Sequence, residues 1–199
     1  MASIWCALRT YDDHAKEMGG QALTSPRFFL KPWGALTQPK QGSEIVIPQH
    51  LVEVHHEVEL VLKLDEDLGY SKFAVGLDLT DRQTQKIAKS EGMPWTQSKG
   101  FANSAIIGNF SEPSVALSHL RLELSINGNV RQDSSIDEMR FTPLNLIKQL
   151  SDWAPIGAGD LLFCGTPSGV GPMQRGDHVQ ARLLSEEGTI LSELDFHLA

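Results

Sequence analysis

The sequence predicts a strand-rich α+β domain. Short apolar runs, most of them ended by glycine or proline, recur along the chain. Patterns long enough for a helix are few, so we expect only a few short helices. Asn127-Gly128 lies between two alternating segments and favours a type I′ turn, which predicts a β-hairpin over residues 121–132. The chain has 199 residues and no evident internal repeat or linker, and we expect a single domain covering residues 1–199.

The predicted strands are short and end at residues that favour turns. Pro32 follows an apolar run over residues 27–31, and Pro48 follows another over residues 45–47. The longest strand-like segment covers residues 51–64. We expect further strands within residues 1–10, 73–79 and 161–164, and a final hairpin over residues 177–197.

Three segments have the features of helices. A short helix is expected from Asp12 or Asp13 to Gly19-Gly20. Thr80 and Gln83 have the spacing of a capping box, which predicts a helix starting at Thr80 and ending near residue 90. Pro143 opens an amphipathic pattern and predicts a third helix.

The charge and composition of the chain exclude several classes of partner. Lysine and arginine number 17 against 25 acidic residues, which gives a net charge of −8. Nucleic acids and anionic membranes repel such a protein, so we expect neither partner, and a small ligand or a metal cation suits the charge better. Cys6 and Cys164 form neither a CxxC motif nor a disulfide framework, which favours reduced thiols. The sequence shows no signal peptide or bilayer-length apolar segment, which predicts a soluble cytoplasmic protein.

Two glutamates in the longest predicted strand are candidate metal ligands. Residues two apart share one face of a strand, so Glu57 and Glu59 project together, about 6–7 Å apart. The alternate face, from Val52 to Leu64, is almost wholly apolar. Carboxylates this close repel one another, and water, basic neighbours or a bound cation relieve the repulsion. A solvated outer face is the alternative interpretation.

Asp78 is a third acidic candidate. It ends a hydrophobic segment directly before the helix predicted from Thr80, where an aspartate is not an obvious surface residue. Because the capping box assigns the cap to Thr80, Asp78 is available for other chemistry. Three carboxylates suit a hard cation such as Mg²⁺ or Mn²⁺, with water and substrate as the remaining ligands.

Other polar residues have spacings that suit a catalytic site. Arg82 and Gln85 are three apart and share a helix face. Lys99 stands before a glycine and is positioned to meet a carboxylate or a developing oxyanion, although solvation is the commoner fate of a lysine. His14 and Glu17 are also three apart, which suits an imidazole base oriented by a carboxylate, but an HxxE match alone is a weak signal.

A glycine-rich loop over residues 165–171 follows the predicted strand at residues 161–164. It matches neither GxGxxG nor GxxxxGK[ST], so a nucleotide site is not predicted. Its backbone N–H groups and the Thr166 hydroxyl are available to a carboxylate.

Several stretches together resemble the fumarylacetoacetate hydrolase family, in particular its short members that act on acylpyruvates and related keto acids. They are YDDHAKEM, FFLKP, VHHEVEL, GLDLTDRQTQ, PWTQSKGF, INGNVRQ and GDLLFCGTPSGVGP. They occur in the family's order and cover most of the chain, from about Cys6 to the final hairpin. The resemblance implies the family's C-terminal-domain-like fold, a rolled mixed β-sheet core with a few short helices, usually in a homodimer.

The resemblance also implies roles for particular residues. The family binds Mg²⁺ or Mn²⁺ through three carboxylates, which correspond to Glu57, Glu59 and Asp78. Its histidine–glutamate pair lies on a lid, here about residues 10–25, and its catalytic lysine is matched as well. The implied catalytic residues are His14, Glu17 and Lys99, and the implied substrate-binding residues are Arg82, Gln85, Lys31 and Thr166.

Three positions depart from the family's pattern. The family usually has a glycine and an asparagine just before the tyrosine of its YxxH segment, where this chain has Leu8 and Thr10. Leucine lacks the backbone freedom of glycine, and threonine is a shorter polar group than asparagine. An aspartate commonly follows the arginine of the metal-following helix, where this chain has Gln83.

The resemblance implies a metal-dependent hydrolase that cleaves a C–C bond in acylpyruvates or related 2,4-dioxo acids, as an acylpyruvate or fumarylpyruvate hydrolase does. The cation would stabilise enolate charge, while the His14–Glu17 pair would activate water. The same site without the attacking water supports an oxaloacetate tautomerase or decarboxylase, or a hydroxymuconate-type isomerase of aromatic degradation. A non-enzymatic keto-acid-binding or metal-binding module is the third alternative.

Overall fold

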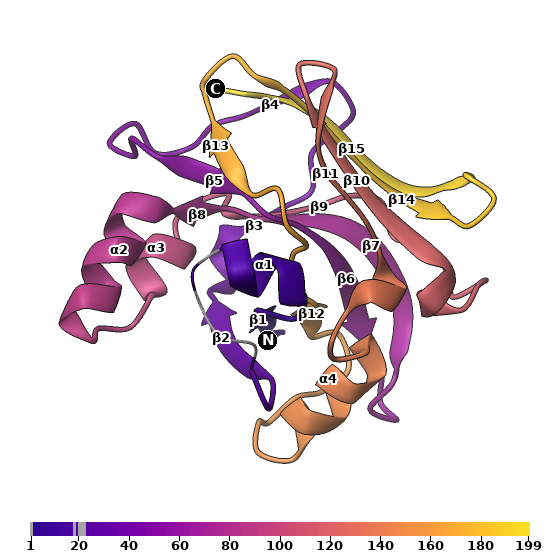
Figure 1. Ribbon diagram of the computed structural model, residues 1–199. Coiled ribbons are helices and arrows are strands. Elements are labelled where there is room, and N and C mark those ends of the chain that lie inside the picture. Colours follow the sequence, from indigo (N-terminus) through magenta and orange to yellow (C-terminus); the bar gives the residue numbers. More distant parts are fainter. Residues whose placement is uncertain (1, 18, 20–22) are drawn as a thin grey trace.

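A large mixed sheet forms the centre of the fold in this computed structural model, which describes residues 2–17, 19 and 23–199 (Figure 1). Its strands lie in the order β2-β1-β12-β6-β7-β9-β3. In chain order they are β1 (Ile4–Leu8), β2 (Arg27–Lys31), β3 (Leu36–Thr37), β6 (Val58–Leu64), β7 (Tyr70–Asp78), β9 (Ala105–Ile107) and β12 (Leu161–Phe163). The pairs β1–β12 and β3–β9 are parallel and the other pairs are antiparallel.

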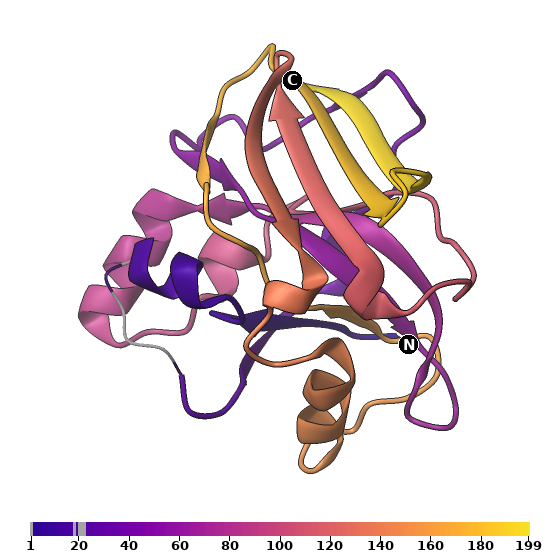
Figure 2. The same cartoon turned by 45° about the vertical axis from the view of Figure 1, so that its right-hand side comes forward.

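A second sheet packs on the first and closes the main core. It has the order β11-β10-β14-β15-β4. Its strands are β4 (Ser43–Ile45), β10 (Leu120–Ile126), β11 (Asn129–Ser135), β14 (His178–Ser185) and β15 (Ile190–Leu198). Figure 2 shows its long strands standing as a separate layer beside the large sheet. Strand β10 contacts β6, and strands β14 and β15 contact β7, so apolar side chains of both sheets are buried between the layers.

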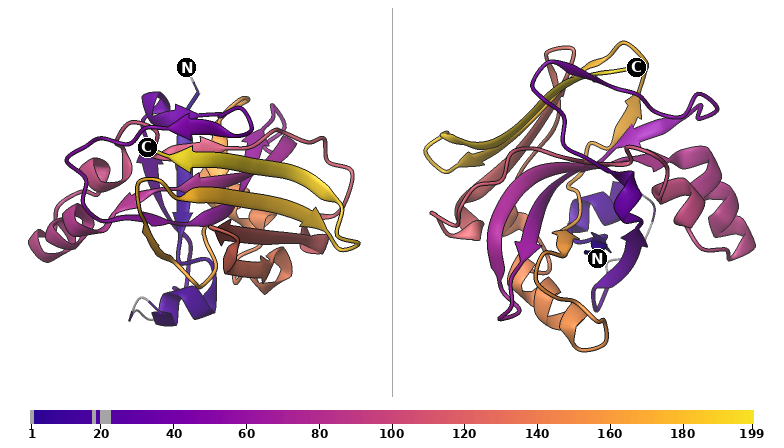
Figure 3. Two further views of the ribbon diagram at one scale, coloured as in Figure 1. Left: turned by 90° about the horizontal axis from the view of Figure 1, so that it is seen from above. Right: turned by 180° about the vertical axis from the view of Figure 1, so that it is seen from behind.

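A small third sheet and the helices complete the described chain. The third sheet, in the order β13-β5-β8, contains β5 (Val54–His56), β8 (Thr80–Asp81) and β13 (Gly171–Met173). The α-helices are α1 (Asp12–Glu17), α2 (Arg82–Glu91), α3 (Thr96–Lys99) and α4 (Pro143–Ser151). Short 3₁₀ helices are η1 (Trp33–Ala35), η2 (Leu117–His119) and η3 (Ile136–Glu138). Figure 3 shows α2 and α3 together at one side of the molecule, away from α4. Within the described residues, the helices are too short or too polar to cross a membrane.

The predicted fold class and several elements are confirmed. Strand β2 has the predicted bounds, 27–31, and α4 begins at Pro143 as expected. Strands β10 and β11 form the predicted hairpin, with Asn127 at φ 52° and Gly128 at φ 77°, as a type I′ turn requires. Strands β14 and β15 form the predicted C-terminal hairpin.

The predicted long strand over residues 51–64 is wrong in two respects. It is broken at Glu57, which lies between β5 and β6, and each part pairs in a different sheet. Neither face of β6 is solvated, because apolar clusters cover both faces of this strand within the large sheet. Leu60 and Leu62 belong to the core between the sheets, whereas Val61 packs in a second apolar cluster on the opposite face. Glu59 is therefore buried, and the solvated alternative fails for this residue.

The predicted capping box at Thr80 is also wrong. Thr80 belongs to the short strand β8, and the N-cap of α2 is Asp81, whose carboxylate accepts from the backbone N–H of Thr84. Because Thr80 and Asp81 pair with β5 as strand β8, the helix begins at Arg82 and not at Thr80. Gln83 consequently has no capping role and lies exposed on the helix surface.

The first predicted helix is observed as α1, over residues 12–17. Its predicted end at Gly20, and the part of the predicted lid at residues 18 and 20–22, lie outside the described residues.

Candidate active site

Three buried carboxylates meet at the point where β5 ends and β6 begins. The backbone N–H of Asp78, the last residue of β7, donates to the carbonyl of Glu57 at 2.9 Å, which brings Asp78 against the strand break. Glu57, Glu59 and Asp78 each offer a carboxylate oxygen, and these oxygens all lie within 4.8 Å of one another. The residues are 6%, 1% and 1% exposed, so their charges need compensation from inside the protein.

Lys99 and Arg82 compensate two of these carboxylates. The Nζ atom of Lys99 lies 2.7 Å from Oε2 of Glu57 and 2.6 Å from Oδ2 of Asp78, and Nη2 of Arg82 lies 2.5 Å from Oε1 of Glu57. Burial by itself raises the pKa of Glu57, but the charges of Lys99 and Arg82 outweigh it and lower the pKa to about 2. Burial likewise opposes the charge of Lys99, and the two carboxylates raise its pKa above the ordinary value. The ion pairs therefore hold these groups in their charged forms.

Glu59 lacks such compensation. Its Oε2 accepts a hydrogen bond from the backbone N–H of Gly165 at 2.6 Å, and it forms no ion pair with a described residue. Burial, followed by the negative charges of Asp78 and Glu57, raises the pKa of Glu59 well above its usual value. A cation among the three carboxylates would relieve this cost. The ligand set is made of oxygen atoms alone, which suits a hard divalent ion such as Mg²⁺ or Mn²⁺.

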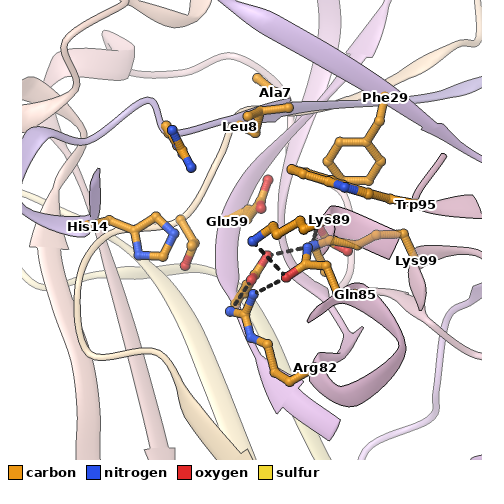
Figure 4. Close-up of a pocket in the computed structure, with 14 residues that line it drawn as sticks. Ala7, Leu8, His14, Phe29, Glu59, Arg82, Gln85, Lys89, Trp95 and Lys99 are labelled. Carbon is orange, nitrogen blue, oxygen red and sulfur yellow. Dashed lines mark hydrogen bonds and ion pairs between the residues drawn. The ribbon is translucent and has the colours of Figure 1, made fainter. Parts of the chain in front are cut away.

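His14, one member of the predicted catalytic pair, lines the cavity across from Lys99 (Figure 4). Figure 4 shows His14 on one side of the cavity and Lys99, Gln85 and Arg82 on the other, with Glu59 between them. The Nδ1 atom of His14 lies 3.1 Å from Oε2 of Glu17, which is hydrogen-bond distance. The other Glu17 oxygen accepts from the backbone N–H of Gly169 at 3.0 Å, so this contact joins α1 to the glycine-rich loop.

The structure brings three of the four predicted substrate-binding residues to the cavity. Arg82, Gln85 and Thr166 line it, and Nη1 of Arg82 donates to Oε1 of Gln85 at 2.8 Å. Lys31 does not line the cavity and is 2% exposed. Its ammonium lies behind Asp78, 2.7 Å from Oδ1, and donates to the carbonyls of Leu79, Lys99 and Ser104. This position places Lys31 outside the described cavity lining, in contact with the proposed metal ligand Asp78.

Further residues line the cavity that the sequence did not single out. Arg9 and Lys89 add positive charge, and Phe29 and Trp95 add aromatic surface. The sequence could have predicted Lys89 as a cavity residue, because its spacing from Arg82 and Gln85 (i, i+3, i+7) places all three on one helix face. No sequence pattern predicts Arg9 at the cavity, since its left-handed backbone, at φ 55°, is visible only in the structure.

The three departures from the family pattern fall in different places. Leu8 lines the cavity, and Gln83 does not. The Thr10 hydroxyl donates to the carbonyl of Cys164 at 2.8 Å and packs against Gly165, the residue that donates to Glu59. Threonine at this position therefore supports the backbone beside the carboxylates.

Two curated mitochondrial proteins are similar to this chain over most of its length. The mouse (Mus musculus) mitochondrial oxaloacetate tautomerase FAHD1 is 35% identical over 191 residues, which cover 90% of this chain and 86% of that protein. The mitochondrial oxaloacetate decarboxylase of Dictyostelium discoideum is 35% identical over 184 residues, which cover 86% of this chain and 84% of that protein.

Solved structures show the same fold. Fumarylpyruvate hydrolase from Pseudomonas aeruginosa, in complex with Mn²⁺ and pyruvate, superposes with a TM-score of 0.91 at 30% identity, covering 100% of this chain and 90% of that one. The fumarylacetoacetate (FAA) hydrolase C-terminal family matches residues 3–194. The chain therefore belongs to the fumarylacetoacetate hydrolase family of metal-dependent enzymes.

Proposed function

We propose that this protein holds Mg²⁺ or Mn²⁺ at Glu57, Glu59 and Asp78 and acts on oxaloacetate as a tautomerase or decarboxylase. The observation that carries the proposal is the buried carboxylate triad, whose oxygens lie within 4.8 Å of one another in a cavity that Lys99 and His14 also line. The curated relatives named above include an oxaloacetate tautomerase and an oxaloacetate decarboxylase, each 35% identical.

The charge of the cavity favours a doubly negative substrate. Arg9, Arg82, Lys89 and Lys99 line it, facing the three carboxylates of the triad. With a divalent cation added, the positive charges among the described residues that line the cavity clearly outnumber the three carboxylates. An oxo-diacid such as oxaloacetate compensates this excess better than a monoanionic oxo-acid does.

The bound cation, His14 and Lys99 each have a distinct role in the proposed reaction. A bound divalent ion supplies Lewis acidity toward the carboxylate and 2-oxo groups of an oxo-acid. His14 donates from Nδ1 to Glu17, which leaves Nε2 as the basic nitrogen. In tautomerisation, Nε2 would remove a proton from C3 of the keto form and return it to the 2-oxo oxygen, which gives the enol. In decarboxylation, the bond between C3 and the 4-carboxylate would break, CO₂ would leave, and C3 would take up a proton. Lys99 places its positive charge beside the triad and favours the negative charge that develops at the 2-oxo oxygen.

Hydrolysis of an acylpyruvate is the second candidate function. The His14–Glu17 contact that suits proton abstraction from carbon also suits activation of a water molecule. The water would add to the distal carbonyl, and cleavage of the C–C bond would release a carboxylic acid and pyruvate. The similar structure from Pseudomonas aeruginosa is that of a fumarylpyruvate hydrolase and contains Mn²⁺ and pyruvate, which supports this alternative.

A panel of substrates tests the proposal and separates the two candidates. Oxaloacetate, acetylpyruvate and fumarylpyruvate are each incubated with Mg²⁺ or Mn²⁺, with and without EDTA. Enol absorbance measures tautomerisation, and lactate dehydrogenase measures pyruvate release. We expect conversion of oxaloacetate that EDTA abolishes. Conversion of the acylpyruvates alone would favour the hydrolase, and conversion of no oxo-acid would contradict both and favour a binding module.

A further inference from the structure

Gln132 lies behind the cavity wall, on β11, and its side chain forms a complete set of hydrogen bonds. The residue is 1% exposed. Its Oε1 accepts from the backbone N–H of Val58 at 3.0 Å and lies 2.9 Å from Nδ1 of His56. Its Nε2 donates to Oγ1 of Thr166 at 2.8 Å and to the carbonyl of Pro167 at 3.0 Å. A glutamine amide has two acceptor sites and two N–H groups, so its full capacity is used.

Two of these partners fix the orientation of the amide. The backbone N–H of Val58 can only donate, so the atom facing it must be the amide oxygen. The carbonyl of Pro167 can only accept, so the atom facing it must be the amide nitrogen. A flipped amide would place its NH₂ group against the N–H of Val58 and its oxygen against the carbonyl of Pro167. The two backbone partners therefore determine the orientation of the Gln132 amide.

The fixed amide sets the roles of its other two partners. His56 must carry a proton on Nδ1 in order to donate to Oε1. Thr166 must accept at Oγ1, because Nε2 of Gln132 donates to it. The single hydroxyl proton of Thr166 is then directed elsewhere, and no described residue accepts it in a hydrogen bond. Thr166 lines the cavity, so its proton is available there.

We infer that Gln132 is a positioning residue that makes the Thr166 hydroxyl a hydrogen-bond donor toward an oxygen of the bound oxo-acid. Gln132 does not line the cavity; of its described hydrogen-bond partners, only Thr166 does. The inference rests on the proposed function for the identity of the ligand. A free hydroxyl could turn either its proton or its lone pairs toward an anion, whereas this one presents its proton.

The variant Gln132→Glu reverses the direction of the hydrogen bond between residue 132 and Thr166 and nearly preserves the shape of the side chain. The new carboxylate can still accept from Val58 and His56, but it has no N–H to donate to Thr166 or to the Pro167 carbonyl. The Thr166 hydroxyl then donates to the carboxylate and presents its lone pairs to the cavity. Thr166→Val removes the hydroxyl, and Thr166→Ser keeps it as a conservative control. Gln38→Glu makes the same chemical change at a glutamine that donates to the carbonyl of Gly108, away from the cavity.

The full-length protein is titrated with pyruvate in the presence of saturating Mn²⁺, and binding is followed by calorimetry. We expect Gln132→Glu and Thr166→Val each to weaken pyruvate binding about tenfold or more, as loss of a hydrogen bond to a charged group predicts. Thr166→Ser should bind pyruvate more tightly than Thr166→Val, because it restores the hydroxyl, and Gln38→Glu should bind within about twofold of the wild type. In the Thr166→Val background, Gln132→Glu should weaken binding by less than about twofold, because its effect passes through the hydroxyl.

Wild-type affinity in Gln132→Glu, or losses that multiply fully in the double variant, would overturn the inference. So would an equal loss of Mn²⁺ affinity in Gln132→Glu, since Gln132 would then act on the metal ligands. Melting temperatures of the variants establish that each protein is folded.

A second measurement on the wild type needs no variant and no substrate. At about pH 8, where an ordinary histidine is neutral, the ¹⁵N shifts of His56 should report a proton on Nδ1. A proton on Nε2 alone would overturn the assigned amide orientation. Absence of pyruvate binding or turnover in the wild type would contradict the proposed function, while the His56 tautomer would still decide the amide orientation.

Discussion

Gly165 lies beside Glu59, where the backbone of the glycine-rich loop closely approaches Thr10. Its φ is +95°, and an added Cβ would lie 2.1 Å from Oγ1 of Thr10. Its backbone N–H donates to the carboxylate of Glu59 at 2.6 Å. Because both the backbone angle and the close approach require glycine, a side chain here would shift the loop away from Glu59.

Gly165→Ala should lower the free energy of unfolding by about 2–4 kcal/mol, because backbone strain and a steric clash add. Urea denaturation measures the loss. Gly188→Ala is the matched control, since Gly188 also has positive φ, +84°, but an added Cβ would meet no atom within 4 Å. The control should lose only about 1 kcal/mol from backbone strain. Equal losses in the two variants would show that the contact with Thr10 is unimportant.

Lys31 is a buried cation whose partner is one of the proposed metal ligands. Its Nζ lies 2.7 Å from Oδ1 of Asp78, and neither side chain is more than 2% exposed. Burial lowers the pKa of Lys31, and the charge of Asp78 opposes that shift. Removal of the ammonium would leave the Asp78 carboxylate with less compensation in a buried setting.

Lys31→Met should therefore destabilise the protein by about 3–5 kcal/mol, as breaking one side of a buried ion pair does. Lys16→Met is the comparison, because the Lys16–Asp13 pair is 75% and 78% exposed and solvent replaces its contact. Chemical denaturation should resolve a large loss in the first variant and little change in the second. A Lys31→Met protein as stable as the wild type would contradict this account of the buried pair.

Helix α2 contributes residues to the candidate site, and the position of its first turn depends on which residue is the N-cap. The Asp81 carboxylate accepts from the N–H of Thr84, whereas Thr80, the cap expected from the sequence, is buried in β8. The Thr80 hydroxyl has no hydrogen-bond partner among the described residues. The start of α2 matters because Arg82 and Gln85, on its first turns, reach the cavity.

Asp81→Ala should cost about 0.5–2 kcal/mol of stability, the usual loss of an N-cap. Thr80→Val should be neutral or stabilising, because it replaces a buried hydroxyl without a partner by an apolar group of similar shape. Thermal and urea unfolding of both variants compare the two positions directly. A larger loss in Thr80→Val than in Asp81→Ala would restore the capping box predicted from the sequence.

Local signals in the sequence predicted elements well where one segment determines its own conformation. The Asn127-Gly128 turn needs positive φ at both residues, and the first helical position of α4 suits Pro143. The break at Glu57 was not predictable, because it arises where β5 pairs with β13 while β6 pairs with β7 and β12. Pairing between distant segments, such as Ile4 with Leu161, leaves no mark on either segment alone.

The candidate site shows the same division between local and tertiary information. Alternation placed Glu57 and Glu59 together, and the position of Asp78 at a strand end identified the third carboxylate. Their burial, and the contact of Lys99 with two of them, depend on how the sheets pack. Lys31 and Gln132 act on the site from behind it, and only the folded chain reveals those contacts.

The whole molecule is acidic, with a net charge of −8, yet the described lining of its cavity is rich in cationic side chains. This contrast favours local recognition of an anionic substrate once a divalent cation occupies the triad. A homodimer and a cytoplasmic location remain predictions, and sedimentation equilibrium of the purified protein tests the first.

Binding of a divalent ion should stabilise the entire fold, because the triad joins β6, β7 and the segment between β5 and β6. Titration with Mg²⁺ should raise the melting temperature, with a gain of about 2.7 kcal/mol in unfolding free energy at 100 times the Kd. Glu59→Gln should greatly reduce the shift. Glu53→Gln, at a glutamate whose side chain is 54% exposed, should keep it. A melting temperature that does not respond to Mg²⁺ or Mn²⁺ would count against the proposed site.

The most direct test of the central claim is anomalous diffraction from crystals grown with Mn²⁺ and pyruvate. We predict one strong anomalous peak within coordination distance of carboxylate oxygens from Glu57, Glu59 and Asp78, with pyruvate oxygens completing the ligands. A fully ordered cavity without a peak, or a manganese ion bound elsewhere while these three side chains keep only protein contacts, would contradict it.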